Sequence, residues 1–161
     1  MIRQINPTDA EAVVAIYNHY IIHNIATFEL EPIDAQTMQQ RIASIGDKYP
    51  YLVYEENNQI LGYAYASEWK GRKAYSRTVE TSVYLHSEAK GKGIGTKLYT
   101  QLIEELKSMN MHALIGGISL PNEASVALHE KFGFEKIGQF KEVGRKFDKW
   151  IDVGYWELVI L

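Results

Sequence analysis

The stretch VYLHSEAKGKGIGTKLYTQLIEEL, which runs from Val83 to Leu106, decides the fold of this chain. A short apolar strand leads into a polar loop, three alternating glycines follow, and an amphipathic helix begins directly after them. A glycine-rich turn at a helix start leaves backbone N–H groups without partners and pointing outward. Because these groups and the helix dipole attract anions, the turn is a candidate site for a phosphate-bearing molecule.

The turn from Lys90 to Thr96, KGKGIGT, matches neither of two common phosphate-binding motifs. A P-loop requires a Gly-Lys-Ser/Thr tripeptide, which this turn lacks. In the dinucleotide fingerprint the third glycine falls one residue later, and an acidic residue closes the next strand, whereas no acidic residue closes residues 113–118 here. A purely structural turn remains an alternative, but Lys90 and Lys92 add positive charge at the helix start, which favours an anion site.

Composition narrows the class of protein. The chain has 161 residues, a formal net charge of -3 and no cysteine. The length suits a single domain over residues 1–161. The small negative charge does not indicate a surface that binds nucleic acid or an anionic membrane. The absence of thiols excludes disulfides and a cysteine nucleophile, and the histidines have no metal-ligand spacing. With no apolar signal or membrane-spanning run, we expect a cytoplasmic protein without nucleic-acid, membrane or metal partners.

Hydrophobic periodicity and turn residues predict an α/β chain (α+β in some schemes) with the order βααβββαβαββ, a mixed sheet flanked by helices. The expected strands are residues 2–5, 51–54, 60–66, 79–85 and 113–118, with two more in 134–161. Thr8 is the expected N-cap of the first helix, whose apolar face contains Ala12, Ile16, Tyr20 and His23, and Asp34 caps a second helix that ends at Gly46. The third helix has Leu98, Leu102, Leu106 and Met109 on one face, and the fourth covers residues 122–131.

Two motifs carry a resemblance to a known family. A basic residue followed by Gly-x-Gly-x-Gly, between a strand and an amphipathic helix, resembles the acetyl-CoA pyrophosphate loop of the GNAT N-acetyltransferases. Downstream, residues 120–134 (LPNEASVALHEKFGF) resemble the second motif of that family. The resemblance implies the GNAT acyl-CoA N-acyltransferase fold, a mixed and mostly antiparallel sheet flanked by helices, over nearly the whole chain. It also implies acetyl-CoA as co-substrate.

Shorter motifs resemble one branch of the family, the phosphinothricin and methionine-sulfoximine acetyltransferases. They are TFE at residues 27–29, VETSVY at 79–84, NEAS at 122–125 with His129, and VGRKF at 143–147 before Trp150. One departure is Lys90, where the family usually has Arg or Gln; lysine keeps the charge without the planar fork. The branch implies transfer to the α-amine of a small L-amino-acid analogue such as phosphinothricin, methionine sulfoximine or methionine sulfone. Dimers are common in it, so it also implies a homodimer.

The resemblance assigns Glu80 as the general base. Strand alternation puts Glu80, Ser82 and Tyr84 on one side of the strand and Val83 on the other. A primary amine is mostly protonated at neutral pH, since simple amines titrate near ~8 to 10. A carboxylate in a partly dry cleft can take that proton directly or through a water. Without the family, Glu80 reads as a solvated strand residue. Direct transfer in a ternary complex is favoured because the chain offers no cysteine nucleophile.

The resemblance also implies the residues that hold acetyl-CoA. Main-chain groups of the strand end would pair with the pantetheine arm, the glycine turn would hold the pyrophosphate, and two residues of the second motif would reach the arm and a phosphate. These residues are Val83, Tyr84 and Leu85 for the strand, Gly91, Lys92, Gly93, Ile94, Gly95 and Thr96 for the turn, and Asn122 and Lys131 for the second motif.

The remaining candidates concern the acid and the acceptor. His129 occupies the region where many GNAT enzymes carry a tyrosine that protonates the leaving CoA thiolate, and a packed structural histidine is the alternative. Phe28, Arg72 and Tyr75 lie in loops expected to form the acceptor pocket, and Arg72 suits a bidentate contact to an anionic group. The basic loop of residues 69–77 could equally be a solvated surface.

Two other functions remain open. The same fold could acetylate a polyamine, an aminoglycoside or a protein N-terminus, although a polycationic acceptor calls for an acidic pocket and the candidate loop is basic. A non-catalytic acyl-CoA sensor would use the fold only for binding and would have no need of Glu80.

Overall fold

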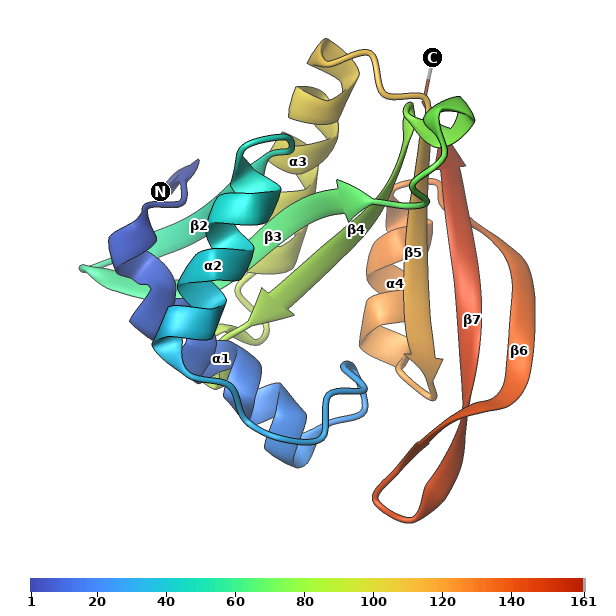
Figure 1. The fold of residues 1–161 in the computed structure, drawn as a ribbon, viewed down its shortest axis with the longest axis horizontal. Helices are drawn as coiled ribbons and strands as arrows, with labels where there is room; N and C mark the ends of the chain where they lie inside the picture. The colour runs from blue at the N-terminus through green and yellow to red at the C-terminus, as the bar shows by residue number, and fades with distance from the viewer. Residues whose placement is uncertain (161) are drawn as a thin grey trace.

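The computed structural model describes residues 1–160 and contains the predicted order of elements (Figure 1). The strands are β1 (Ile2–Gln4), β2 (Tyr51–Glu56), β3 (Gln59–Glu68), β4 (Thr78–Leu85), β5 (Ala113–Leu120), β6 (Glu135–Lys146) and β7 (Lys149–Val159). The helices are α1 (Ala10–His23), α2 (Ala35–Gly46), α3 (Ile94–Ser108) and α4 (Glu123–Lys131). Short 3-10 turns cover Pro7–Asp9, Lys73–Tyr75 and Ser87–Ala89. Leu161, the last residue of the predicted C-terminal region, lies outside the described residues.

The strands form one seven-stranded mixed sheet in the order β1-β2-β3-β4-β5-β7-β6. Every neighbouring pair is antiparallel except β4 and β5, which are parallel. Helices α1 and α2 cover one face of the sheet, and α3 and α4 cover the other (Figure 1). Each face therefore has its own apolar core, with Leu98, Leu102 and Leu106 of α3 fully buried in one and Val13 of α1 in the other.

The sheet opens between β4 and β5. Their ladder has three register pairs, Thr78 with Ala113, Val79 with Leu114, and Glu80 with Ile115. Beyond these pairs, residues 81–85 continue along β3 and residues 116–120 continue along β7, and in the described part of the chain they do not pair with each other. Figure 1 shows the two strands diverging toward their C-terminal ends. We call the space between residues 81–85 and 116–120 the V-shaped opening; it leaves a strand edge free on each side.

The predicted start of the first helix is wrong. Thr8 lies inside the 3-10 turn Pro7–Asp9, and α1 begins at Ala10. Asp9 accepts the backbone N–H of Asn6 at 2.7 Å and two hydrogen bonds from Arg3, at 2.8 and 3.0 Å. These contacts stabilise the tight turn before the helix, which local propensity did not reveal.

The predicted apolar face of α1 is also partly wrong. Ala12 and His23 are exposed, whereas the buried residues are Ala10, Val13, Val14, Ile16, Tyr17 and Ile21. A strict spacing of four residues drifts around a helix that has about 3.6 residues per turn. Because α1 is apolar on several sides, the sequence did not show which side packs against the sheet.

Other local predictions are confirmed. Asp34 caps α2 by accepting the backbone N–H of Thr37 at 2.7 Å. Asn57 and Asn58 connect β2 to β3 with φ of 52° and 62°, as expected of a tight hairpin turn. Met109 is an exception, because it follows the end of α3 and is exposed. Within residues 1–160, none of the helices combines the length and apolar character needed to cross a membrane.

Candidate active site

The glycine turn lies at the start of α3, as predicted. Gly91 and Gly93 have φ of 79° and 72°, a region that glycine enters without the cost borne by other residues. Gly93 is the N-cap of α3, and it has no side-chain cap. The first N–H groups of the helix, those of Ile94, Gly95 and Thr96, therefore have no intrahelical partner. The turn is a set of outward backbone donors that suits a pyrophosphate group.

Helix α4 brings two further cofactor candidates to the sides of the opening. The Lys131 ammonium donates to the Thr96 hydroxyl at 3.4 Å, so its charge lies beside the turn. Asn122 is the N-cap of α4, where its side-chain oxygen accepts the backbone N–H of Ser125 at 3.1 Å. Asn122 also lines an open groove of about 470 Å³ beyond the end of β5. A cation thus lies beside the glycine turn, and an amide lies beside the end of β5.

The main-chain groups of β4 alternate in direction. The Tyr20 hydroxyl contacts both the C=O and the N–H of Leu85, at 3.0 and 3.2 Å, so both groups of Leu85 face away from β3. In an antiparallel ladder the direction reverses at each residue. Val83 therefore shares the direction of Leu85 toward the opening, whereas the main chain of Tyr84 faces β3. The geometry is compatible with a backbone role for Val83 and, where Tyr20 is displaced, for Leu85. It does not support the predicted backbone role of Tyr84, whose main chain faces β3 and whose ring packs against Tyr17, Tyr20 and Tyr63.

Glu80 lies where the ladder between β4 and β5 ends. Its side chain is half-buried, and within residues 1–160 it has no hydrogen bond or ion pair. Burial raises the pKa of Glu80 above the ordinary value of a glutamate. A carboxylate without a partner, made more basic by burial and set at an opening, is suited to accept a proton.

The residues that surround Glu80 were not predicted from the sequence. A Cβ built on Gly117 of β5 would lie 3.4 Å from Oε1 of Glu80 and 3.2 Å from the ring of Tyr155 on β7. The Tyr155 ring in turn makes edge-on contacts with Trp69, at 5.9 Å between centroids, and with Phe140, at 5.8 Å. Glu80 therefore lies near Tyr155, which is the central member of an aromatic cluster. The available signal was the Gly116-Gly117 pair, since glycine inside a strand marks a close approach.

His129 is almost fully buried, with 3% of its surface exposed. Its Nδ1 lies 2.7 Å from the Ser125 carbonyl oxygen and its Nε2 lies 3.1 Å from the Tyr99 hydroxyl, which also donates to Thr81 at 3.2 Å. Burial lowers the pKa of His129. A Cβ on Gly116 would lie 2.6 Å from Nε2, so His129 contacts the face of β5 opposite to Glu80.

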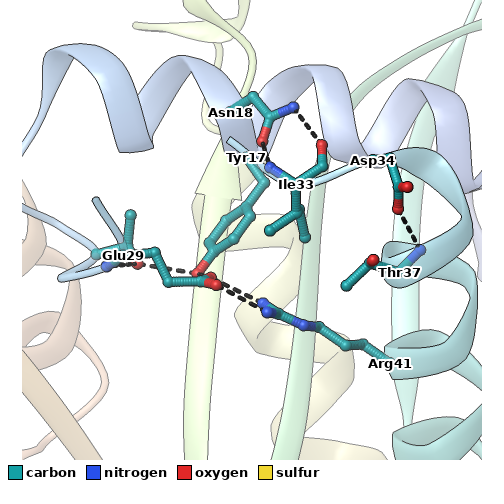
Figure 2. A network of polar contacts seen from close by, with 8 residues as sticks. Tyr17, Asn18, Glu29, Ile33, Asp34, Thr37 and Arg41 are labelled. Carbon is teal, nitrogen blue, oxygen red and sulfur yellow. Dashed lines mark hydrogen bonds and ion pairs between the residues drawn. The ribbon is translucent and has the colours of Figure 1, made fainter. Parts of the chain in front are cut away.

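Phe28 lies in the connection between α1 and α2, residues 24–34, which a polar network stabilises (Figure 2). Arg41 donates two hydrogen bonds to Glu29, both at 2.7 Å, and keeps the pKa of that carboxyl below its usual value. The Tyr17 hydroxyl also bonds to Glu29 and lies 2.9 Å from the Thr27 hydroxyl. The residues on both sides of Phe28 are thereby anchored, while the Phe28 ring stays partly exposed.

Arg72 and Tyr75 lie in the exposed connection between β3 and β4. The Lys70 ammonium lies 5.7 Å from the Trp69 ring and 6.0 Å from the Tyr75 ring. Figure 1 shows this connection at one end of the sheet and the α1–α2 connection at the other. Among the residues described, no hydrogen bond, ion pair or ring contact joins Phe28 to Arg72 or Tyr75, so the structure does not bring the three acceptor candidates together.

Comparison with known proteins identifies the family. The family model described as "Acetyltransferase (GNAT) domain" matches residues 2–154. The L-methionine sulfoximine/L-methionine sulfone acetyltransferase of Salmonella typhimurium is 36% identical over 161 residues, covering 98% of this chain and 92% of that protein. In the part of the chain that the structure describes, no three His, Asp or Glu side chains gather to hold a metal ion.

Two solved structures have nearly the same fold. A GNAT superfamily phosphinothricin acetyltransferase from Sinorhizobium meliloti, in complex with AcCoA, matches with a TM-score of 0.96 and 34% identity, covering 99% of this chain and 88% of that one. A ribosomal-protein-alanine N-acetyltransferase from Brucella melitensis matches with a TM-score of 0.97 and 35% identity over 99% of both chains. The expected fold is therefore confirmed, and the chain belongs to the GNAT acetyltransferase family.

Proposed function

We propose that this protein transfers acetyl from acetyl-CoA to the α-amine of a small L-amino-acid analogue, with phosphinothricin, methionine sulfoximine and methionine sulfone as candidate acceptors. One observation carries the proposal. The carboxylate of Glu80, which has no partner among residues 1–160, lies at the start of the V-shaped opening, and the strand that bears it leads to the glycine turn. A proton acceptor and an acyl-CoA site thus share one opening. The similarity to enzymes named for these acceptors supports the substrate class.

In this proposal acetyl-CoA is held mainly by backbone groups. The outward N–H groups at the start of α3 bind the pyrophosphate, and Lys131 adds charge beside them. The free edge of β4 at Val83 pairs with the pantetheine arm, and Leu85 takes part where the arm displaces the Tyr20 hydroxyl from its main-chain groups. Asn122 contacts the arm from the other side. Because backbone donors do most of the binding, the lysine at position 90 is compatible with this role.

The chemistry is a direct acyl transfer in a ternary complex. Glu80 accepts a proton from the ammonium of the acceptor, directly or through a water, and the freed amine attacks the thioester carbonyl carbon. A main-chain N–H on the free edge of β4 stabilises the oxyanion. The C–N bond forms, the nitrogen of the tetrahedral intermediate loses its second proton to solvent, the C–S bond breaks as the oxyanion collapses, and the CoA thiolate takes up a proton, for which His129 is the candidate donor. Because the pKa of an ordinary thiol is ~8.5, the thiolate needs no strong acid.

The acceptor candidates lie on two separate connections, Phe28 between α1 and α2 and Arg72 with Tyr75 between β3 and β4. An amino-acid analogue carries a carboxylate and a phosphinate or oxidised sulfur group, and the Arg72 guanidinium suits either by a bidentate contact. The 69–77 connection also contains Lys70, Lys73 and Arg77. Its positive charge favours an anionic acceptor over a polyamine.

Mass spectrometry after incubation with acetyl-CoA and each candidate acceptor tests the substrate class. We expect the mass gain of one acetyl group on at least one of them, and the absence of product with all three would remove the claim. A parallel panel of a polyamine, an aminoglycoside and an alanine-terminated peptide covers the other acceptors; the peptide is included because one similar structure is named for ribosomal-protein alanine. Thioester cleavage by wild type that Glu80→Gln abolishes would exclude an acyl-CoA sensor.

The exposed face of β6 supports the further proposal of a homodimer. β6 is an edge strand, and Ile137, Phe140, Val143 and Trp150 on the β6–β7 hairpin are 57–60% exposed. An edge strand with exposed apolar side chains is prone to pair with another strand, and a second copy of the chain would cover it. Light scattering after gel filtration should give the dimer mass for wild type and the monomer mass for Phe140→Glu. The control is Met109→Glu, at an exposed apolar site away from β6, and a monomeric wild type at micromolar concentration would contradict the proposal.

The cysteine-free composition supports a reducing, cytoplasmic location.

A further inference from the structure

We propose that Lys146 is a positioning residue for the acceptor side of the active site. It holds the α1–α2 connection against the β6–β7 hairpin, so that Phe28 is presented to the acceptor. This inference rests on the proposed function. It concerns a residue that lies outside the cofactor turn and away from the catalytic pair.

Lys146 is a buried cation without a carboxylate partner in residues 1–160. Only 3% of its surface is exposed. Its Nζ donates to the carbonyl oxygens of Asn24 at 2.6 Å, Thr27 at 2.8 Å and Tyr20 at 3.4 Å. An ammonium group has three donors, and all three are used. The oxygens belong to the end of α1 and the chain after it, where the helix dipole also favours a positive charge.

These bonds join the two sides of the V-shaped opening. Lys146 ends β6, which belongs to the side formed by β5, β7 and β6. Helix α1 packs against β2, β3 and β4, which lie on the other side of the opening, and its Tyr20 hydroxyl contacts Leu85 at the end of β4. The path from Lys146 through Tyr20 to Leu85 therefore crosses from one side to the other. The short ladder between β4 and β5 joins the two sides at the closed end.

A second contact fixes Phe28 against the same hairpin. A Cβ built on Gly144 of β6 would lie 2.3 Å from the Phe28 ring, so the ring occupies the place of a side chain at position 144. Thr27, which precedes Phe28, gives its carbonyl oxygen to Lys146. The hairpin thus holds both the backbone beside Phe28 and the ring itself, whereas Arg41 holds Glu29 on the other side (Figure 2).

The test compares Lys146→Met with wild type in steady-state kinetics. We expect the acceptor KM to rise by about tenfold, which corresponds to about 1.4 kcal/mol, because Phe28 loses its fixed position, while the KM for acetyl-CoA and kcat stay nearly unchanged. Arg3→Met is the matched control, since Arg3 is also a multiply bonded cation but lies on the far edge strand β1. It should lower the melting temperature without changing either KM.

Gly144→Ala is the second variant, because it keeps Lys146 and displaces only the Phe28 ring. It should raise the acceptor KM, and it tests the inference even if Lys146→Met does not fold. An unchanged acceptor KM in both variants, or a rise equal to that of Arg3→Met, would overturn the inference. Hydrogen exchange of residues 24–33 provides a readout that needs no turnover. If wild type acetylates no acceptor, the proposed function fails, and faster exchange in Lys146→Met but not in Arg3→Met still supports the anchoring role. Unchanged exchange would contradict it.

Discussion

The Tyr99 hydroxyl lies 3.1 Å from Nε2 of His129, and the contact at the other ring nitrogen decides which of the two carries the proton. Nδ1 lies 2.7 Å from the Ser125 carbonyl, which has no hydrogen to give, so in the neutral ring Nδ1 carries the proton and Nε2, beside the Tyr99 hydroxyl, carries none. Since burial also lowers the pKa of His129, the neutral ring is favoured. His129 can act as an acid toward a thiolate only after it gains a second proton.

The lowered pKa of His129 predicts a loss of stability in acid. Between the ordinary histidine value of about 6.5 and the lower folded value, the unfolded chain binds the proton and the folded chain does not. The free energy of unfolding should therefore fall as the pH drops below about 6.5 and through the folded pKa. Urea unfolding across this range should show a shallower pH dependence for His129→Gln than for wild type. His23→Gln, at an exposed site, is the control, and equal slopes for all three proteins would disprove the assignment.

The raised pKa of Glu80 predicts the acidic limb of the rate profile. The carboxylate accepts a proton only when ionised, so kcat/KM for the acceptor should fall on the acid side at a pH above that of an ordinary glutamate. Glu80→Gln should remove this limb and lower the rate by about 100-fold or more, the usual contribution of a general base. Acetyl-CoA binding, measured by calorimetry, should be retained. Glu56→Gln, at the exposed end of β2, should behave as wild type. If Glu80 were not the base, Glu80→Gln would also behave as wild type.

The two glycines of β5 predict different effects for the same small change. In Gly117→Ala the new methyl lies against Tyr155 and Oε1 of Glu80, so we expect kcat to fall by about tenfold with little loss of stability. In Gly116→Ala the methyl meets the buried His129 ring, and overpacking should cost about 1–3 kcal/mol. Thermal unfolding and kinetics of both variants check this division. A rate loss in Gly116→Ala alone would reverse the roles assigned to the two faces.

The glycine turn predicts a specific effect on the cofactor. Gly93→Ala forces a side chain into the left-handed region at φ 72°, at a cost of about 1–2 kcal/mol, and adds a methyl where the anion approaches. The KM for acetyl-CoA should rise more than the KM for the acceptor. Gly46→Ala is the control, because Gly46 has an ordinary φ and a Cβ there meets nothing within 4 Å. If both variants change the KM for acetyl-CoA equally, the turn is only structural.

Local patterns predicted most of the fold. The turn at residues 90–96 and the helix after it follow from neighbouring residues, since caps and apolar spacing act within one or two turns. The start of α1 did not, because Arg3 and Asp9 form an ion pair that replaces a helix cap. The apolar residues of α1 on several sides hid its buried face.

The sequence predicted the candidate site residues that belong to one continuous segment of the chain. It did not predict the contacts between residues that are distant in the sequence. Glu80 and the glycines belong to one strand-turn-helix unit, and strand alternation gave the side of Glu80. Tyr155 joins Glu80 only through the pairing of β7 with β5 opposite Gly117, which no local pattern specifies. Lys146 contacts carbonyls more than a hundred residues away, so the sequence alone showed only a lysine in a hairpin.

The alternating direction of β4 beside the V-shaped opening has a spectroscopic consequence. The amide of Tyr84 is directed into the ladder with β3, whereas the amide of its neighbour Val83 is directed to the open edge. In the free protein, the Val83 amide should therefore exchange its hydrogen with solvent far faster than the Tyr84 amide. A ligand that adds itself as a strand would slow the first and leave the second unchanged. The ratio of the exchange rates of the Val83 and Tyr84 amides thus reports whether a ligand occupies the opening, and the measurement requires no turnover.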